Sequence, residues 1–165
     1  MKVKIGPYRT HRWYHNFLYK FGIKNEQRVS VRIDKYDTWN MNTTLSHIVV
    51  PMLEQYKESH QGSPVIDLED VPMQLRTEDH FFDRWDWVLN EMLFAHQSAL
   101  EDWEEQFCSG EHDISWLEQP DSDNREMVIG PKDTFKVDKE GLAAFHKRVK
   151  NGYRLFGKYY ENLWD

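Results

Sequence analysis

Alternating apolar and polar positions near the N-terminus predict two short strands. Residues 28–34 alternate strictly, which predicts a half-buried strand. Its inward-pointing side chains are expected to be Val29, Val31 and Ile33. Residues 2–5 alternate in the same way until Gly6 and Pro7 end the run, so a second strand is expected there.

Apolar side chains recur with helical spacing in four longer segments. They cover residues 12–21, 43–57 and 79–107, and the C-terminal stretch that follows Asp138. The third segment is the most regular. We expect it to form one helix of roughly 40 Å with Leu89 and Leu100 in the core.

Individual residues are expected to shape these helices. Gly22 should end the first helix in left-handed geometry, and Pro51 should kink the second or delay its start. Asp138 should cap the fourth helix. Gly152 and Gly157 are expected to be weak points within it.

The remaining segments combine acidic and turn-forming residues. Residues 111–125 are acidic and contain Pro120, which is typical of an exposed loop. Residues 127–129 and 135–137 flank a run of turn formers and predict a β-hairpin. Together the elements predict an α+β fold, with three or four helices packed on a small, largely antiparallel sheet. The length suits a single domain over residues 1–165.

Composition narrows the function classes. The chain has 21 basic and 28 acidic residues and a formal net charge of −7, which argues against sequence-general binding of nucleic acid. Its one cysteine, Cys108, excludes an internal disulfide and is typical of a reducing interior. With no long apolar run and 15% aromatic residues, we expect a folded, soluble, intracellular protein that has no membrane partner.

The first candidate site follows the clearest strand and precedes a helix. A junction of this kind can bind anionic or polar ligands at free backbone N–H groups. Its candidate ligand-binding residues are Lys35, Tyr36, Asp37, Trp39 and Asn40. The lysine would neutralise a phosphate, the aromatic rings would stack on a planar group, and the polar side chains would read hydrogen-bonding edges. The alternative is a capping junction with buried aromatics.

The second candidate site is the glycine-containing turn over residues 60–64. His60 and Ser63 are its candidate ligand-binding residues, although the spacing is not that of a P-loop. The carboxylates at 67, 69 and 70 could bind a divalent cation, but they lack EF-hand spacing. The alternative for the whole segment is a solvated acidic turn.

The third candidate site lies on one side of the long helix. Arg84, Trp87 and Glu91 are seven or four residues apart and would line a pocket between helices. The alternative is that this stripe is core. His11 and His15 have metal-ligand spacing, but the glutamate of a zinc protease motif is missing. We therefore expect no catalytic residues, no metal and no cofactor.

Five segments occur in a fixed order over about residues 31–107. They are VRIDKYDTWNMNTTL (31–45), PML (51–53), HQGSP (60–64), DLEDVP (67–72) and RWDWVLNEMLFA (84–95). Together they resemble a family of small, uncharacterised proteins of tailed bacteriophages, whose pattern has an acidic residue where Asn42 stands. The resemblance implies a phage product in the cytoplasm of an infected bacterium, acting in host takeover, counter-defence or virion-related assembly.

Two functions from different classes fit these observations. In the first, the chain captures and sequesters a small nucleotide-derived ligand, such as a host immune signal, without converting it. In the second, it is a protein-interaction module that inhibits or redirects a host or phage protein. The acidic surface and the abundance of Trp, Tyr and Met favour that second function. A hydrolase stays open because carboxylates and histidines are plentiful, and homo-oligomers are left open too.

Overall fold

The computed structural model describes residues 1–5, 13–22, 29–118 and 125–164. Some expectations depend on Gly6, Pro7, His11, Arg28 and Pro120, which lie outside the described residues. Contacts divide the chain into two compact units, Met1–Leu45 and Ser46–Asp165, and each is described here by itself. The single domain expected from the sequence stays a prediction.

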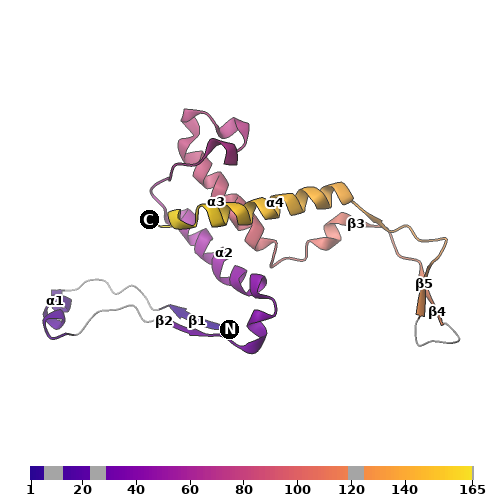
Figure 1. The fold of residues 1–165 in the computed structure, drawn as a ribbon, viewed down its shortest axis with the longest axis horizontal. Coiled ribbons are helices and arrows are strands. Elements are labelled where there is room, and N and C mark those ends of the chain that lie inside the picture. The colour runs from indigo at the N-terminus through magenta and orange to yellow at the C-terminus, as the bar shows by residue number, and fades with distance from the viewer. Residues whose placement is uncertain (6–12, 23–28, 119–124, 165) are drawn as a thin grey trace. The chain divides into compact units, whose positions relative to one another are not determined.

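Helices dominate the described chain, and its strands pair two by two (Figure 1). The helices are α1 (Trp13–Lys20), α2 (Met41–Ser59), α3 (Phe81–Gln97) and α4 (Lys139–Lys158). The strands are β1 (Lys2–Ile5), β2 (Val29–Arg32), β3 (Cys108–Ser109), β4 (Ile114–Glu118), β5 (Arg125–Ile129) and β6 (Lys136–Val137). They form the antiparallel ladders β1–β2, β3–β6 and β4–β5. The α+β class is confirmed.

The N-terminal unit contains the β1–β2 ribbon and α1. Both expected strands are present, and Gly22 follows α1 with a left-handed φ of 75°, as expected. The expected burial is wrong, because Val29, Val31 and Ile33 are 60%, 54% and 54% exposed. A two-stranded ribbon has an apolar face but brings no second layer to cover it.

The core of the C-terminal unit is built around α3. Trp85, Val88, Leu89 and Met92 are fully buried on this helix, and Leu155 of α4 is fully buried with them. Residues from α2, the 66–71 segment and the end of α4 complete the cluster: Val50, Leu53, Ile66, Val71 and Tyr159. Leu89 is therefore in the core, as the helical period predicts.

Gly152 allows α4 to lie close against α3. A Cβ atom at this position would meet the carbonyl oxygen of Glu91 and would lie 2.6 Å from the Cβ of Ala95. A side chain of any size would therefore push the two helices apart. The sequence analysis treated Gly152 as a weak point, but it is the residue that allows this contact.

The helix expected over residues 79–107 is shorter in the structure. α3 ends at Gln97, where the Ser98 hydroxyl donates a hydrogen bond to the Ala95 carbonyl and competes with the helical pattern. Trp103 and Phe107 keep their helical spacing in the sequence, but they pack on Phe145 of α4 instead. The chain therefore folds back at this point.

Two expectations about the C-terminal strands are wrong. The acidic segment contains β4, which pairs with β5, and β6 pairs with β3, so the expected hairpin between 127–129 and 135–137 does not form. The Asp113 carboxylate accepts a hydrogen bond from the Lys132 N–H at 2.9 Å, and Asp133 accepts one from the Asp113 N–H at 3.1 Å. These bonds use the turn residues to close the base of the β4–β5 ribbon.

The other two helices meet their expectations in part. α2 contains Pro51 and begins at Met41, so its start is not delayed. The Asp138 side chain accepts a hydrogen bond from the Gly141 N–H at 3.0 Å and caps α4, as predicted.

Replacing Gly152 by Ala tests the close approach of the helices. We expect G152A to lower the free energy of unfolding by about 1–3 kcal/mol, because the added methyl group overpacks the contact. G157A is the matched control on the same helix, since a Cβ there meets no atom within 4 Å. It should be neutral or stabilising by up to about 1 kcal/mol. Urea unfolding that shows equal effects for both variants would contradict the contact.

Candidate functional site

The first predicted site is a single turn of 3-10 helix, Lys35–Thr38, in the N-terminal unit. The Asp37 carboxylate accepts a hydrogen bond from the Asp34 N–H at 2.7 Å and lies 2.8 Å from the Met1 amino group. Hydrogen bonds from the amino group and then from Asp34 hold the pKa of Asp37 below its usual value. Asp37 therefore serves the turn, in agreement with the capping interpretation.

The aromatic residues of this turn point to solvent. Tyr36 is 84% exposed and Trp39 is 90% exposed, so the buried aromatics of the capping interpretation are absent. Lys35 is exposed as well. Asn40 uses its carbonyl to accept the Thr44 N–H at the start of α2. Four of the five predicted residues, Lys35, Tyr36, Trp39 and Asn40, are thus exposed.

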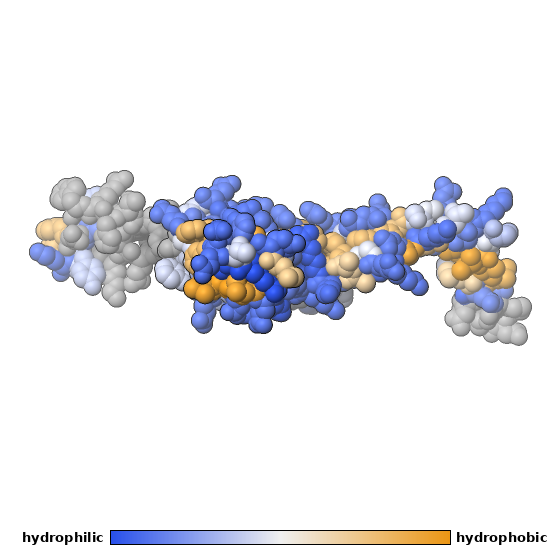
Figure 2. Space-filling model, turned by 90° about the horizontal axis from the view of Figure 1, so that it is seen from above, coloured by the Kyte–Doolittle hydropathy of each residue, from blue (hydrophilic) through white to orange (hydrophobic). Residues whose placement is uncertain are grey.

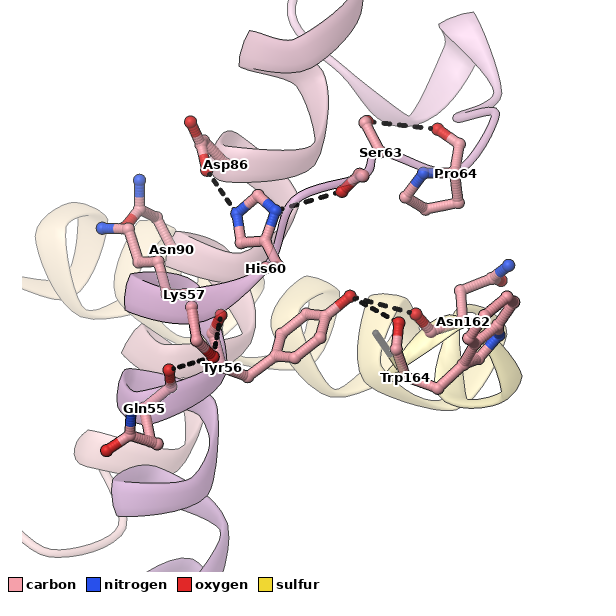
Figure 3. Close-up of polar contacts among 12 residues, drawn as sticks. Gln55, Tyr56, Lys57, His60, Ser63, Pro64, Asp86, Asn90, Asn162 and Trp164 are labelled. Carbon is pink, nitrogen blue, oxygen red and sulfur yellow. Dashed lines mark hydrogen bonds and ion pairs between the residues drawn. The ribbon is translucent and has the colours of Figure 1, made fainter.

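The second predicted site, the 60–64 turn, is held by its own polar groups (Figure 3). The His60 Nδ1 atom lies 3.0 Å from the Gly62 carbonyl oxygen, and its Nε2 atom lies 3.2 Å from Asp86 of α3. The Ser63 hydroxyl donates to the Pro64 carbonyl at 3.3 Å. His60 therefore fastens the turn to α3 and offers no unpaired nitrogen to a phosphate.

Arg84 is buried and bound to the backbone. Its Nε atom donates to the Leu75 carbonyl at 2.7 Å, and one Nη atom donates to the Thr77 carbonyl at 2.6 Å. These bonds attach the segment that precedes α3 to the helix itself. The guanidinium group therefore acts as a structural donor, and Arg84 follows the alternative in which this stripe is core.

Of the three residues predicted to line a pocket, Trp87 and Glu91 line a hollow of about 850 Å³ beside α3. Arg148 of α4 binds the buried Glu91 carboxylate through contacts of 2.7, 2.9 and 3.1 Å. The same guanidinium lies 3.7 Å above the Phe94 ring. Neither His60 nor Arg84 lines this hollow. The common ligand site that includes Lys35, His60 and Arg84 stays a prediction.

Two carboxylates of the 67–70 segment, which the sequence left open as cation ligands, pair with basic side chains. Asp70 is buried and accepts from Lys158 at 2.6 Å, from Tyr159 at 2.7 Å and from Arg154 at 2.7 Å. Burial alone would raise the pKa of Asp70, but these three donors outweigh it and lower the pKa. Lys158 also pairs with Asp67 at 2.6 Å. Among the described residues, no cluster of three or more His, Cys, Asp or Glu is placed to hold a metal ion.

A buried serine–histidine contact lies between α2 and α3. The Ser46 hydroxyl is 3.0 Å from Nδ1 of His96, and the rings of Tyr153 and Phe156 meet the imidazole edge-on. Within the part of the chain that the structure describes, Nε2 of His96 has no hydrogen-bond partner. Ser46 is 0% exposed, so a substrate has no path to its hydroxyl. The contact belongs to the core, and burial lowers the pKa of His96.

The β4–β5 ribbon carries an exposed apolar face that the sequence analysis missed. Cross-strand partners share a face, so Ile114 lies with Ile129 and Trp116 lies with Met127. Their exposed fractions are 37%, 63%, 59% and 51% in that order. Figure 2 shows hydrophobic residues gathered over this ribbon. We call these four side chains the apolar ribbon face.

Acidic residues dominate the segment that forms the ribbon. Residues 111–134 contain seven acidic and two basic side chains, a net charge of −5. Alternation would have revealed the face, because residues 114–118 and 125–129 each place apolar side chains two apart. The many acidic residues of this segment instead led to the prediction of an exposed loop.

Comparison of the chain with protein-family models, curated proteins and solved structures finds no match. In the described chain, no helix is both long and apolar enough to cross a membrane. The physical properties of these surfaces therefore carry the functional argument.

The free energy of unfolding should fall as the pH drops below about 6.5, the ordinary pKa of the histidine. The unfolded chain gains a proton on His96 at that pH, whereas burial keeps the folded imidazole neutral. H96Q removes this titration and keeps a polar group beside Ser46. Urea unfolding at pH 7.5 and 5.5 should show a smaller pH-dependent loss for H96Q than for the wild type. Equal losses would contradict the titration of His96.

Proposed function

We propose that the chain is a protein-interaction module that binds a basic partner protein through the apolar ribbon face. The exposure of Ile114, Trp116, Met127 and Ile129 on one side of β4–β5 is the observation that carries this proposal. Tryptophan and methionine are enriched in protein interfaces, and tryptophan is a frequent source of binding energy there.

The exposed apolar face does not contribute to the stability of the chain by itself. A two-stranded ribbon is marginal in water, because one face of each strand stays hydrated. Burying the Trp116 and Met127 side chains against a partner would remove that apolar surface from water. The ribbon is therefore suited to dock on another surface.

The charge of the ribbon segment defines the chemistry of the partner. Residues 111–134 have a net charge of −5, because acidic residues flank the apolar residues of the face along the chain. Complementary charge speeds encounter and disfavours wrong partners. Two ribbons of the same charge would repel each other, so the occupant we propose is a different protein with an apolar centre and a rim rich in lysine and arginine.

Two hydrogen bonds to Asp133 stabilise the base of the ribbon. The Asp133 carboxylate accepts hydrogen bonds from the Asp113 and Phe135 N–H groups at 3.1 and 3.2 Å. The bond from Asp113 is the largest cause that lowers the pKa of Asp133, with the His112 contact adding to it. A ribbon that is ordered before binding loses less entropy when the partner docks.

The capture of a small nucleotide-derived ligand, the first of the two functions expected from the sequence, stays a prediction. Two of its expected groups, Arg84 and His60, make hydrogen bonds within the C-terminal unit. The phage origin, the location in an infected bacterium and the role in counter-defence stay predictions of the resemblance.

Substituting Trp116 tests the interaction surface. The immobilised full chain is presented to a bacterial lysate, and the retained proteins are compared between W116S and L117S. Leu117 is the matched control, because it is 55% exposed on the opposite face of the same strand. We expect a basic protein that the wild type and L117S retain and W116S loses. With the purified partner, W116S should raise Kd by about 30-fold or more.

Three results would overturn the proposal. The first is the same set of retained proteins for all three chains. The second is a partner that lacks an excess of lysine and arginine or binds equally at low and high salt. The third is self-association of the purified chain, seen by sedimentation in the wild type and lost in W116S. Thermal unfolding of W116S and L117S checks that both variants keep the fold, which we expect because both side chains are exposed.

A further inference from the structure

The two compact units of the chain have opposite charge. Residues 1–45 contain nine basic and three acidic side chains, a net charge of +6. Residues 46–165 contain twelve basic and twenty-five acidic side chains, a net charge of −13. The whole-chain value of −7 therefore hides a basic N-terminal unit. The sequence argument against nucleic-acid binding used only the whole-chain value.

The β1–β2 ribbon gathers positive charge on one face. Its register pairs Lys2 with Arg32 and Lys4 with Ser30, so these side chains share a face. The opposite face holds valine residues. Lys2 and Lys4 are exposed, and the Arg32 side chain is 79% exposed and lies 3.6 Å from Asp34. Three cations on one face of a ribbon match the charge of a phosphodiester backbone.

Exposed aromatic rings follow the basic ribbon in the sequence. Tyr36 and Trp39 are 84% and 90% exposed, and Lys35 precedes them. The planar faces of these exposed rings suit unpaired bases. Stacking of a base on an aromatic side chain contributes about 1–3 kcal/mol and tolerates any base.

Few carboxylates in this unit oppose a polyanion. Asp34 and Asp37 are the acidic residues in its described part. Asp37 is paired with the Met1 amino group and the Asp34 N–H, and its charge is compensated there. Asp34 lies 3.6 Å from Arg32 and offsets part of the ribbon charge, but the unit as a whole keeps its net charge of +6.

We propose that the N-terminal unit binds single-stranded nucleic acid. Lys2, Lys4 and Arg32 contact phosphates, and Tyr36 and Trp39 stack on bases. We infer a single strand rather than a duplex from the exposed aromatic residues, because the bases of a duplex are already stacked on each other. This surface belongs to a different unit from the apolar ribbon face, and the inference goes beyond the proposed protein interaction.

Fluorescence anisotropy of the full chain with a labelled single strand of about 20 nucleotides tests this proposal. The affinity is measured at several salt concentrations between about 50 and 200 mM, because counterion release makes the affinity depend strongly on salt in this range. The substitution K2Q/K4Q/R32Q should make the log–log salt slope shallower by about 2, since each phosphate contact contributes about 0.7. W39A should weaken binding at least about 5-fold and leave the slope unchanged.

The control variant K139Q/K147Q/K150Q removes the same charge from exposed lysines of α4. It should keep both the affinity and the slope. The proposal is overturned by the absence of saturable binding at the lowest salt, or by equal losses in the control and the ribbon variant. A duplex of the same sequence that binds more tightly than the single strand, with no effect of W39A, also overturns it.

Discussion

The close contact between α3 and α4 at Gly152 is the constraint on which the C-terminal unit depends. With the Glu91 backbone and the Ala95 side chain against this glycine, α4 is held near enough to contact α3 along its length. Arg148 then reaches the Glu91 carboxylate, and Tyr153 reaches the ring of His96. These contacts all require the same separation between the helices. A single methyl group at position 152 would disturb every one of them.

The same contact organises the polar interior. Asp70, Glu91 and His96 are buried, and burial of a charged or polar group is unfavourable unless it is paired. Lys158 and Arg148 supply partners from α4 for the two carboxylates. These buried charged and polar side chains are thus used to hold helices and loops together. Both ribbons, in contrast, keep apolar or basic side chains exposed.

Sequence patterns predicted the positions of helices and strands better than they predicted which faces of these elements are buried. Alternation located the strand at Val29–Arg32, but alternation reports only that the two faces differ, and it cannot say whether another layer covers the apolar one. Helical spacing predicted α3 and placed Leu89 in the core. It carried the helix too far, because Trp103 keeps the spacing while packing on Phe145 after the turn at Ser98.

The candidate site shows why residue types alone do not identify ligands. Arg84 binds backbone carbonyls, which have no sequence signature, and Asp70 binds Lys158, 88 residues away. Exposure of Tyr36 and Trp39 could not be inferred either, since a capping turn with buried rings has the same sequence. The apolar ribbon face was present in the sequence as two runs of alternating residues, but acidic neighbours obscured it.

Hydrogen exchange of the full chain, followed residue by residue, tests most directly whether the helices carry the stability while the ribbon is only presented by them. The account predicts that the α3 amides around Leu89 and Met92 exchange only through global unfolding. The β4–β5 amides should exchange through local opening at a much lower free energy. Equal protection of the ribbon and α3 would contradict the account, because the ribbon would then be part of the same cooperative core.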